Sequence, residues 1–382
     1  MKIGILCYPT YGGSGVVATE LGKGLARLGH QIHFISYRQP ARLTHYSENI
    51  YYHEVSNVDY PLFEYPPYDT ALTSKIVDIV IHEKLDLLHV HYAIPHATIA
   101  YMAKQILGTY GIVLPVITTL HGTDITLVGN NRSFSPVVEF SINKSDGVTA
   151  VSESLKRDTI NNFNICRDIK VIYNFIDFER FSRQNKEHFR KAIAPNDEKI
   201  LVHTSNFRKI KRVDDVVRIF RRVNEVIPSK LLLIGDGPER QNLEDLCRNE
   251  GIAEHVRFLG KQDAIEEILA IGDLFLIPSG SESFGLAALE AMACQVPVIS
   301  SNIGGLPEVN IHGETGYLCD VGDVEGMANY SIQLLSDDNN LNVFRQNALF
   351  QAQRFDIKSI LPEYVSYYEE ILERVNGKLE IA

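Results

Sequence analysis

KIGILCYPTYGGSGVVATELGKGLARLGHQIHFISY, residues 2–37, contains an apolar run of strand length, a glycine-rich loop, an amphipathic segment of helix length and a second apolar run. The two apolar runs are short and uniformly apolar, which is typical of parallel strands buried on both faces. The same alternation continues at LDLLHVH (85–91), PVITTLHG (115–122) and GVTAVS (147–152). The N-terminal half is therefore predicted to be a doubly wound α/β domain.

The alternation stops at a polar, charged run and begins again at KILVHTS, residues 199–205. Further strand-length runs follow at KLLLIGDG (230–237), VRFLG (256–260), LFLIPS (274–279) and PVISS (297–301). The fold class is therefore α/β, with two doubly wound Rossmann-like domains facing each other across a cleft, where such folds bind ligands. The predicted domains are 1–172 and 173–358, followed by an amphipathic C-terminal helix, 359–382, that we expect to pack back on the N-terminal domain.

The composition is that of a soluble globular protein. Of the 382 residues, 45% are hydrophobic and 22% are charged, and the net charge at pH 7 is −11. Such a chain can fill more than one core, which excludes a disordered, collagen-like or coiled-coil protein. Because the net charge is negative, we expect no nucleic-acid partner, and any phosphate must bind in a local basic pocket.

The sequence also indicates where the protein resides. The N-terminal run MKIGILCYPT is too short for a signal peptide, and no stretch approaches the roughly 18 consecutive apolar residues of a membrane helix. The five cysteines are scattered and include no C-x-x-C pair, which favours free thiols in a reducing compartment. We therefore expect a cytoplasmic protein that does not insert into a membrane.

A glycine-rich loop follows the first predicted strand. Gly13, Ser14 and Gly15 open a helix, where backbone N–H groups can approach an anionic ligand. Residues 13–18 also spell G-x-G-x-x-A, a partial dinucleotide-binding fingerprint, so a nicotinamide-dependent oxidoreductase is one alternative. Against it, residues 9–11 lengthen the loop, and the second strand ends without the acidic residue that would bind a ribose. A plain strand-to-helix turn is the other alternative.

Two glutamates mark the last part of the second domain. Glu282 and Glu290 are eight residues apart in GSESFGLAALEAMAC. On one continuous helix they would lie about a quarter-turn apart. We instead place Glu282 in the loop after the strand LFLIPS and begin the helix near Phe284, capped by Ser281 or Ser283.

This arrangement would present the N–H groups of residues 284–286 to a phosphate or hydroxyl group. Glu290 would lie lower on the helix, where its carboxylate can accept hydrogen bonds from ribose hydroxyls. The alternative is a pair of ordinary glutamates, one solvated and one at a helix cap.

A basic segment opens the second domain. SNFRKIKRVDD places Arg208, Lys209, Lys211 and Arg212 directly after a predicted strand. Against a net charge of −11, they provide the local positive charge that a diphosphate needs. The alternative is an exposed basic turn balanced by the two aspartates that follow, and we expect it to hold for Lys209 and Arg212 only.

Several histidines lie at predicted strand ends. His89 and His91 alternate in LLHVHYAIPH, His96 follows, and His121 stands in TTLHGTD. A metal site would need ligands from several loops, and H-x-H alone does not indicate one. We predict no metal, and His121, beside Gly122, is the best candidate for contact with a polar substrate. No pattern indicates a Ser or Cys nucleophile.

Taken together, these motifs resemble the retaining family 4 glycosyltransferases of the GT-B fold. The glycine loop, the His-Gly pair, the basic segment and E-x7-E occur in the family's order. Further matching segments are GDGP (235–238), VRFLG (256–260), GGLPE (304–308) and HGETG (312–316), so that the resemblance covers nearly the whole chain.

The resemblance implies a donor, an acceptor and their domains. The segments CYPTYGGSGVVATELG, KLDLLHVHYAIPHA, TTLHGTDIT, SNFRKIKRVDDVV and ESFGLAALEAMACQVPVI are most similar to family members that transfer N-acetylglucosamine from UDP-GlcNAc to L-malate in bacillithiol biosynthesis. By this resemblance, residues 1–172 are the acceptor domain and 173–358 the nucleotide-sugar donor domain.

It also implies roles for single residues. Glu282 would hold a hydroxyl of the donor sugar, His121 would hydrogen-bond the sugar near C6, and Lys211 would neutralise the diphosphate. Many relatives have Gly-Arg where this chain has Ser205-Asn206, so Arg208 is expected to replace their phosphate-binding arginine. The full set of expected donor-binding residues is Gly13, Ser14, Gly15, Asn206, Arg257, Leu259, Ser283, Phe284, Gly285, Leu286 and Glu290.

The implied reaction is glycosyl transfer with retention, in which the leaving diphosphate acts as the base and no metal or cofactor takes part. Malate carries two carboxylates, so its site should be polar and locally positive. The expected acceptor-binding residues are Ser14, Tyr92, Thr123, Arg132 and Asn174.

Other functions remain open at this point. A glycosyltransferase of the same fold with a lipid acceptor is one, the oxidoreductase is a second, and a non-catalytic sugar-nucleotide binding protein is a third. A homo-oligomer is expected only from the general frequency of such assemblies.

Overall fold

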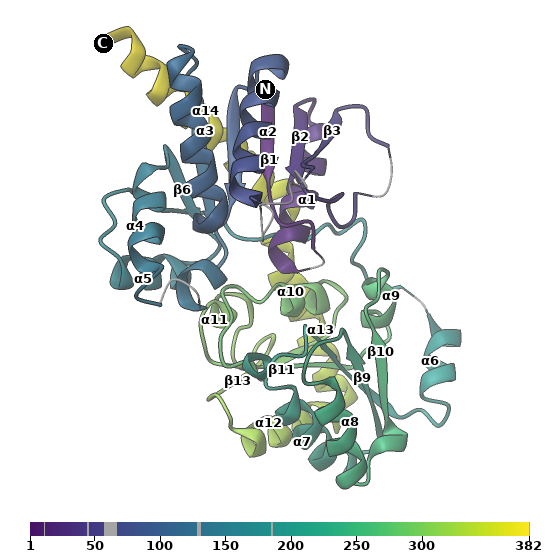
Figure 1. Cartoon of the computed structure of the whole chain (residues 1–382). Coiled ribbons are helices and arrows are strands. Elements are labelled where there is room, and N and C mark those ends of the chain that lie inside the picture. Colours follow the sequence, from purple (N-terminus) through teal and green to yellow (C-terminus); the bar gives the residue numbers. More distant parts are fainter. Residues whose placement is uncertain (11, 44–45, 57–66, 128–130, 185, 382) are drawn as a thin grey trace. The chain divides into compact units, whose positions relative to one another are not determined.

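The computed structural model describes residues 1–10, 12–43, 46–56, 67–127, 131–184 and 186–381. The chain forms two compact units. Unit 1 comprises Met1–Asn174 together with Ile357–Ala382, and unit 2 comprises Phe175–Asp356. Each unit is built on a parallel sheet with helices packed around it (Figure 1), which confirms the predicted α/β class. The boundaries expected from the sequence are 172–173 and 358–359.

Unit 1 contains a seven-stranded sheet in the order β3-β2-β1-β4-β5-β6-β7, with every neighbouring pair parallel. Its strands are β1 (Lys2–Leu6), β2 (Gln31–Ser36), β3 (Ile50–Glu54), β4 (Leu87–His91), β5 (Val116–Leu120), β6 (Gly147–Ala150) and β7 (Lys170–Val171). Its helices are α1 (Gly13–Arg27), α2 (Tyr68–Glu83), α3 (Thr98–Thr109), α4 (Ser135–Lys144), α5 (Glu153–Asn162) and α14 (Ile357–Ile381), with helical turns at Ala93–Ala97 and Thr123–Leu127.

Two strands of this sheet, β3 and β7, were not among the apolar runs of the sequence. β3 is an edge strand whose residues are half-buried or exposed, so IYYHE lacks a continuous apolar run. β7 has only 2 residues. The five inner strands, in contrast, are mostly apolar and almost wholly buried, as expected for a parallel sheet covered on both faces.

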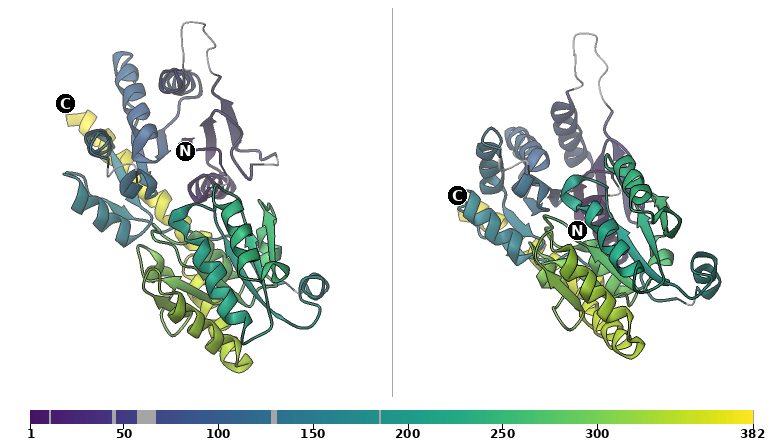
Figure 2. Two further views of the ribbon diagram at one scale, coloured as in Figure 1. Left: turned by 60° about the horizontal axis from the view of Figure 1, so that its bottom comes forward. Right: turned by 90° about the horizontal axis from the view of Figure 1, so that it is seen from below.

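The C-terminal helix α14 belongs to unit 1, and Figure 2 shows it in yellow alongside the blue elements of that unit. Tyr364 and Tyr368 are fully buried. The hydroxyl of Tyr367 accepts a 2.9 Å hydrogen bond from the N–H of Val148. A Cβ on Gly147 would lie 3.0 Å from Ile371, so the glycine lets α14 approach β6 closely.

Unit 2 contains a six-stranded parallel sheet in the order β10-β9-β8-β11-β12-β13. Its strands are β8 (Lys199–Thr204), β9 (Ser229–Ile234), β10 (Val256–Gly260), β11 (Leu274–Ile277), β12 (Val298–Ser301) and β13 (Gly316–Cys319). Its helices are α6 (Glu187–Ile193), α7 (Val213–Asn224), α8 (Arg240–Asn249), α9 (Ile265–Leu269), α10 (Leu286–Ala293), α11 (Leu306–Val309), α12 (Val324–Leu335) and α13 (Asp338–Gln353), with 3-10 turns at Lys209–Lys211 and Ala253–His255.

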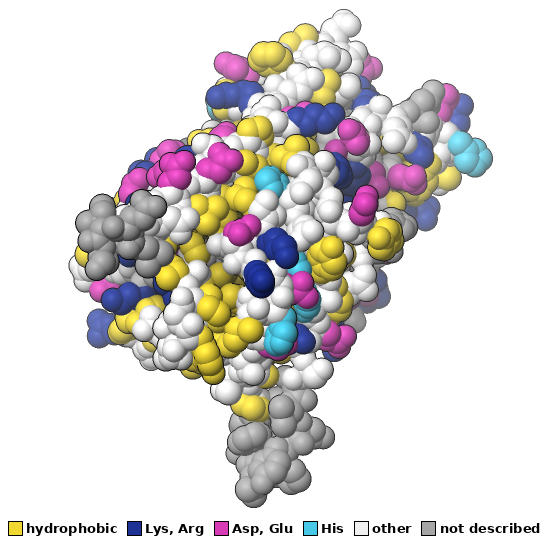
Figure 3. All heavy atoms as spheres, turned by 90° about the horizontal axis from the view of Figure 1, so that it is seen from above, with side chains coloured by type: hydrophobic (Ala, Val, Ile, Leu, Met, Phe, Trp, Pro, Cys, Tyr) yellow, Lys and Arg dark blue, Asp and Glu magenta, His cyan; other side chains and the backbone are white. Residues whose placement is uncertain are grey.

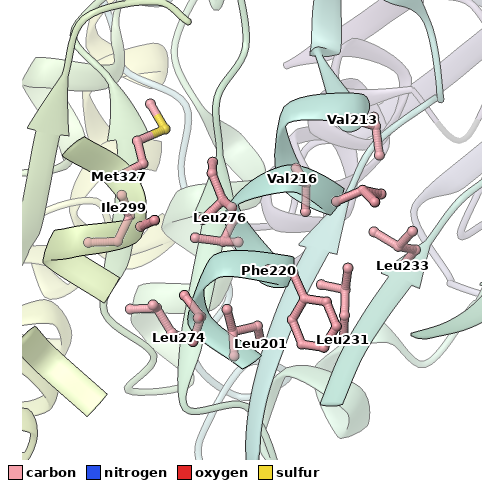
Figure 4. Packing of buried hydrophobic residues seen from close by; sticks show 14 of the residues in the cluster. Leu201, Val213, Val216, Phe220, Leu231, Leu233, Leu274, Leu276, Ile299 and Met327 are labelled. Atoms are coloured by element: carbon pink, nitrogen blue, oxygen red, sulfur yellow. The ribbon is translucent and has the colours of Figure 1, made fainter. Parts of the chain in front are cut away.

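A hydrophobic cluster of unit 2 lies between its sheet and helices that include α7. Phe220 of α7 points toward Leu201 of β8 and Leu231 of β9 (Figure 4), and all three are fully buried. This packing fixes the start of α7, which lies directly after the basic turn Lys209–Lys211.

The surface mixes both signs of charge. On the face in Figure 3, acidic and basic side chains are interspersed with hydrophobic ones. None of the helices in the described parts of the chain combines the length and apolarity needed to cross a membrane.

Candidate active site

Each sheet has one point at which its strand order reverses. In unit 1 it lies between β1 and β4, and in unit 2 it lies between β8 and β11. Doubly wound sheets bind ligands beyond the carboxyl ends of their strands at such a point. The loops that follow these four strands, and the neighbouring β5, are therefore the candidate site.

The loop after β1 passes close to the start of α1. A Cβ on Gly15 would lie 2.5 Å from the carbonyl oxygens of Tyr8 and Thr10, so this approach requires glycine. The next residue back, Ser14, accepts a 2.6 Å hydrogen bond from the hydroxyl of Tyr92. This bond joins the loops after β1 and β4 across the reversal point.

Tyr92 directly follows β4 and has an unusual backbone. Its φ of 88° is in the left-handed region, which is strained for a side chain of this size and is typical of functional sites. Its ring centroid lies 5.2 Å from that of His121. Burial raises the pKa of Tyr92 to about 12, so the hydroxyl stays protonated and acts as a donor at neutral pH.

Asp124 organises the loops after β4 and β5. Its carboxylate accepts hydrogen bonds from the N–H groups of Ala93, at 2.8 Å, and Gly122, at 3.0 Å. A longer one, of 3.4 Å, comes from the N–H of His121. Burial raises the pKa of Asp124 to about 6, although these backbone hydrogen bonds act in the opposite direction. The carboxylate therefore ties the backbone at His121 and Gly122 to that of Ala93.

Four buried histidines lie on or after β4 and β5. Burial lowers the pKa of His89 and of His121 to about 3, that of His96 to about 4, and that of His91 well below its usual 6.5. They are therefore uncharged at neutral pH. Within the described ranges, no group of three or more His, Cys, Asp or Glu residues is arranged to hold a metal ion.

In unit 2, an ion pair spans the reversal point. The Nζ of Lys211, after β8, lies 2.5 Å from Oε1 of Glu282, after β11. The same carboxylate oxygen accepts a 3.0 Å hydrogen bond from Ser279. The side chains are 22% and 14% exposed, so a lysine cation is held in place while remaining accessible.

Two glycines shape the backbone around Glu282. Gly304 has a φ of 58°, and a Cβ there would lie 1.9 Å from the carbonyl oxygen of Glu282. The N–H of Gly305 donates a 2.9 Å hydrogen bond to that oxygen. The GGLPE segment is therefore a close support for the Glu282 loop.

The helix after Glu282 begins later than expected. α10 starts at Leu286, its N-cap is Gly285 with a φ of 100°, and no side chain caps it. The prediction of a start near Phe284 with Ser281 or Ser283 as cap was wrong, because the left-handed backbone of Gly285 cannot continue a helix. Glu282 does lie in the loop before α10, as predicted.

The other donor-side predictions fall on three elements. Glu290 lies within α10 and is 7% exposed, and Phe284 is 2% exposed and packs on Phe355. Asn206 and Arg208 are exposed in the loop after β8. Arg257 and Leu259 lie on β10, an edge strand separated from β8 by β9.

The structure brings together only part of the predicted set. In unit 1 it groups Ser14, Tyr92 and His121, with Thr123 hydrogen-bonded to Tyr92. Gly13 is the first residue of α1. Arg132 is exposed and forms no ion pair with a described residue, and Asn174 is buried at the end of unit 1.

In unit 2 it groups Lys211 with Glu282 and leaves Arg208 without an ion pair to any described residue. Arg212 pairs with Asp215 at 2.6 Å, in agreement with the basic-turn alternative for that residue.

Sequence reasoning missed Asp124 and Ser279 as members of the site. The spacing of Asp124 within HGTD does not show that Ala93 will lie against it. Ser279 had a weak signal, since it ends a predicted strand three residues before Glu282.

These two half-sites, each at a strand-order reversal, are those of a nucleotide-sugar transferase of the GT-B fold. Residues 11–180 match Glycosyltransferase Family 4, and residues 184–349 match Glycosyl transferases group 1. The chain belongs to the family 4 glycosyltransferases, which excludes the nicotinamide-dependent oxidoreductase.

Among its relatives is N-acetyl-alpha-D-glucosaminyl L-malate synthase of Bacillus anthracis, which is 48% identical over 99% of this chain and 100% of its own length. An uncharacterized glycosyltransferase of Methanocaldococcus jannaschii, MJ1607, is 31% identical over 83% of this chain and 84% of its own.

Solved structures share the fold. Anabaena Alr3699/HepE in complex with UDP-glucose superposes with a TM-score of 0.80 at 22% identity, covering 99% of this chain and 100% of that one. Sucrose-phosphate synthase from Thermosynechococcus elongatus gives a TM-score of 0.80 at 20% identity, covering 98% and 100%.

Proposed function

We propose that the protein transfers N-acetylglucosamine from UDP-GlcNAc to the hydroxyl group of L-malate, with retention at the anomeric carbon, as the first step of bacillithiol biosynthesis. The observation that carries the proposal is the Lys211–Glu282 pair in a chain 48% identical to an N-acetyl-alpha-D-glucosaminyl L-malate synthase. Neighbouring structures that hold UDP or UDP-glucose support a uridine diphosphate donor. The proposed location is the cytoplasm, and a homo-oligomer is proposed on general frequency alone.

In unit 2, Lys211 neutralises the diphosphate, with Arg208 as a second cation. As the bond between C1 of the sugar and the phosphate oxygen breaks, negative charge builds up on the leaving diphosphate. A lysine already held by Glu282 stabilises that charge without having to reorganise. Glu282 also accepts a hydrogen bond from a sugar hydroxyl, and Glu290 from the ribose.

In unit 1, the hydroxyl groups of Ser14, Tyr92 and Thr123 bind malate, with Arg132 and Asn174 assisting. The malate hydroxyl forms the new bond to C1 on the face that the diphosphate leaves, and its proton passes to the departing phosphate. The products are UDP and N-acetylglucosaminyl malate.

The test is a mass-resolved turnover assay with UDP-GlcNAc, with and without L-malate, each repeated with EDTA. UDP release that requires malate, gives the mass of a malate-linked N-acetylhexosamine and is unchanged by EDTA is expected. UDP binding without this product would reject malate as the acceptor and favour another acceptor, including a lipid.

A further inference from the structure

Two neighbouring histidines in unit 1 share one hydrogen bond. His91 ends β4, and His121 directly follows β5, the adjacent strand. Nδ1 of His91 lies 2.8 Å from Nε2 of His121, and the ring centroids are 5.0 Å apart. One of these two nitrogens carries the proton and the other accepts it, so each ring restricts the tautomer of the other.

The second ring nitrogen of His91, Nε2, decides which of the two hydrogen-bonded nitrogens carries the proton. This Nε2 is buried and has no hydrogen-bond partner among the described residues. A proton on Nε2 would be a buried donor without an acceptor, which is rarer and costlier than a bare acceptor. The single proton of neutral His91 therefore lies on Nδ1 and is donated to Nε2 of His121.

The consequence falls on His121. Its Nε2 is the acceptor in this bond, so the one proton of the neutral ring lies on Nδ1. The residue retains 9% of its surface exposed, and Nδ1 is the nitrogen left for a ligand. His121 therefore offers a donor, whereas the tautomer with the proton on Nε2 would offer an acceptor.

We propose that His91 is a positioning residue that fixes His121 as the Nδ1–H tautomer, so that His121 donates a hydrogen bond to an oxygen of the transferred sugar. The part that concerns the sugar rests on the proposed function. The part that concerns the tautomer rests on the hydrogen bonds of unit 1 alone.

The surroundings hold His91 in this orientation. Nδ1 of His96 donates a 2.6 Å hydrogen bond to the carbonyl oxygen of His91. The ring centroid of His89 lies 4.5 Å from that of His91. Both nitrogens of His89 are occupied, at 2.7 Å each, by the hydroxyls of Tyr368 and Thr119, so His89 does not compete for His91.

The same arrangement occurs at the far edge of the sheet and provides a matched control. Nδ1 of His33 lies 2.9 Å from Nε2 of His53, between β2 and β3, and Nε2 of His33 is buried with no partner in the described parts of the chain. Replacing His33 removes a His–His hydrogen bond between the same pair of ring nitrogens, in this case partly buried, two strands away from β4.

The experiment is ¹⁵N NMR of the histidine rings in the full-length protein, with signals assigned by their loss in His121→Ala. In the wild type, His121 is expected to carry its proton on Nδ1. In His91→Phe, which removes the donor, His121 should no longer be held in one tautomer, and the Nε2–H form should appear beside the Nδ1–H form. His91→Asn, whose amide reaches the same position as Nδ1, should keep the wild-type tautomer, and so should His33→Phe.

Turnover provides the second readout. His91→Phe should lower kcat/KM for the donor about tenfold, the value of one hydrogen bond, with His91→Asn restoring most of it. In the His121→Ala background, His91→Phe should have no further effect, because a positioning residue acts only through its partner.

A wild-type His121 with its proton on Nε2, or additive effects in the double variant, would overturn the proposal. Absence of turnover in the wild type would instead contradict the proposed function, and the tautomer measurement would still decide the role of His91.

Discussion

Lys211 and Glu282 form an ion pair whose two side chains are only 22% and 14% exposed. Removing two charges from water costs much of what their attraction provides, so such pairs contribute little to stability. What the pair does provide is a cation held ready at a strand-order reversal. We therefore expect Lys211 to contribute to catalysis rather than to the stability of the fold.

Replacing Lys211 by Met should lower kcat/KM for the donor by about 100-fold, because the diphosphate loses a charge-assisted partner. Lys209→Met, on the same 3-10 turn, is the matched control and should have little effect. The measurement is steady-state kinetics with UDP-GlcNAc and malate. Equal losses in the two variants would mean that general positive charge, not the Lys211 position, matters.

Gly304 and Gly313 both have positive φ, 58° and 78°, but differ in their surroundings. A Cβ at 304 would lie 1.9 Å from the Glu282 carbonyl oxygen, whereas one at 313 would have nothing within 4 Å. Gly313→Ala should cost about 1 kcal/mol of unfolding free energy from backbone strain alone.

Gly304→Ala should cost about 2–4 kcal/mol, because steric displacement is added to strain. It should also raise KM for the donor, because it moves Glu282. The measurements are the free energy of unfolding and the KM for the donor in both variants. Equal losses in Gly313→Ala and Gly304→Ala would contradict the prediction.

Helix α7 shows how an element positions a residue that is not part of it. Its apolar stripe, including Val213, Val216 and Phe220, packs on β8 and β9 (Figure 4). Arg218 and Arg222 of the same helix are exposed. The helix begins two residues after Lys211. The location of Lys211 therefore depends on how α7 packs on the sheet.

Phe220→Ala should destabilise the protein by about 3–5 kcal/mol, because it leaves a cavity among fully buried residues. Phe350→Ala is the control in the same unit, since Phe350 is 73% exposed, and it should change little. Urea unfolding gives both values. A cost below about 1 kcal/mol for Phe220→Ala would indicate that the core collapses around the gap.

At the scale of the whole molecule, the path of the chain brings both ends of the sequence into unit 1. Unit 1 is completed by α14 after the chain has formed all of unit 2, so its core contains Tyr364 and Tyr368 from the far end of the sequence. The same core contains uncharged histidines, which link the folding of unit 1 to pH.

Stability of unit 1 should fall as the pH decreases from about 6.5 toward 4. His89, His96 and His121 have pKa values lowered to about 3, 4 and 3 by burial, so the unfolded chain takes up protons that the folded chain does not. Each of these histidines lowers the free energy of unfolding by about 1.4 kcal/mol for every unit by which the pH falls in this range. Asp124, whose pKa is raised to about 6, acts in the opposite direction and offsets one histidine below that pH.

The measurement is the free energy of unfolding between pH 7 and pH 5. His96→Asn keeps a donor for the carbonyl of His91 but cannot titrate, so its pH slope should be shallower by about 1.4 kcal/mol per pH unit. An unchanged slope would contradict the assignment of His96 as neutral.

The features of the fold that were predicted correctly depend on interactions between residues close together in the sequence. Buried parallel strands need continuous apolar runs, and the glycine-rich loop was expected to open a helix, as it does at Gly13. The loop position of Glu282 followed from helical geometry. The edge strand β3 and the start of α10 were missed, because an edge strand needs no apolar run and Gly285 adopts a left-handed conformation that its identity alone does not reveal.

The sequence sufficed for the fold class, the glycine loop, the family and the presence of a basic segment and two glutamates. The pairings within the site came only from the folded chain. Ser14 meets Tyr92 from 78 residues away, Lys211 meets Glu282 from 71, and His91 meets His121 from 30. A hydrogen bond forms only when the distance between donor and acceptor lies within a range of a few tenths of an ångström. At these separations, that precision comes from the packing of adjacent strands and not from spacing along the chain.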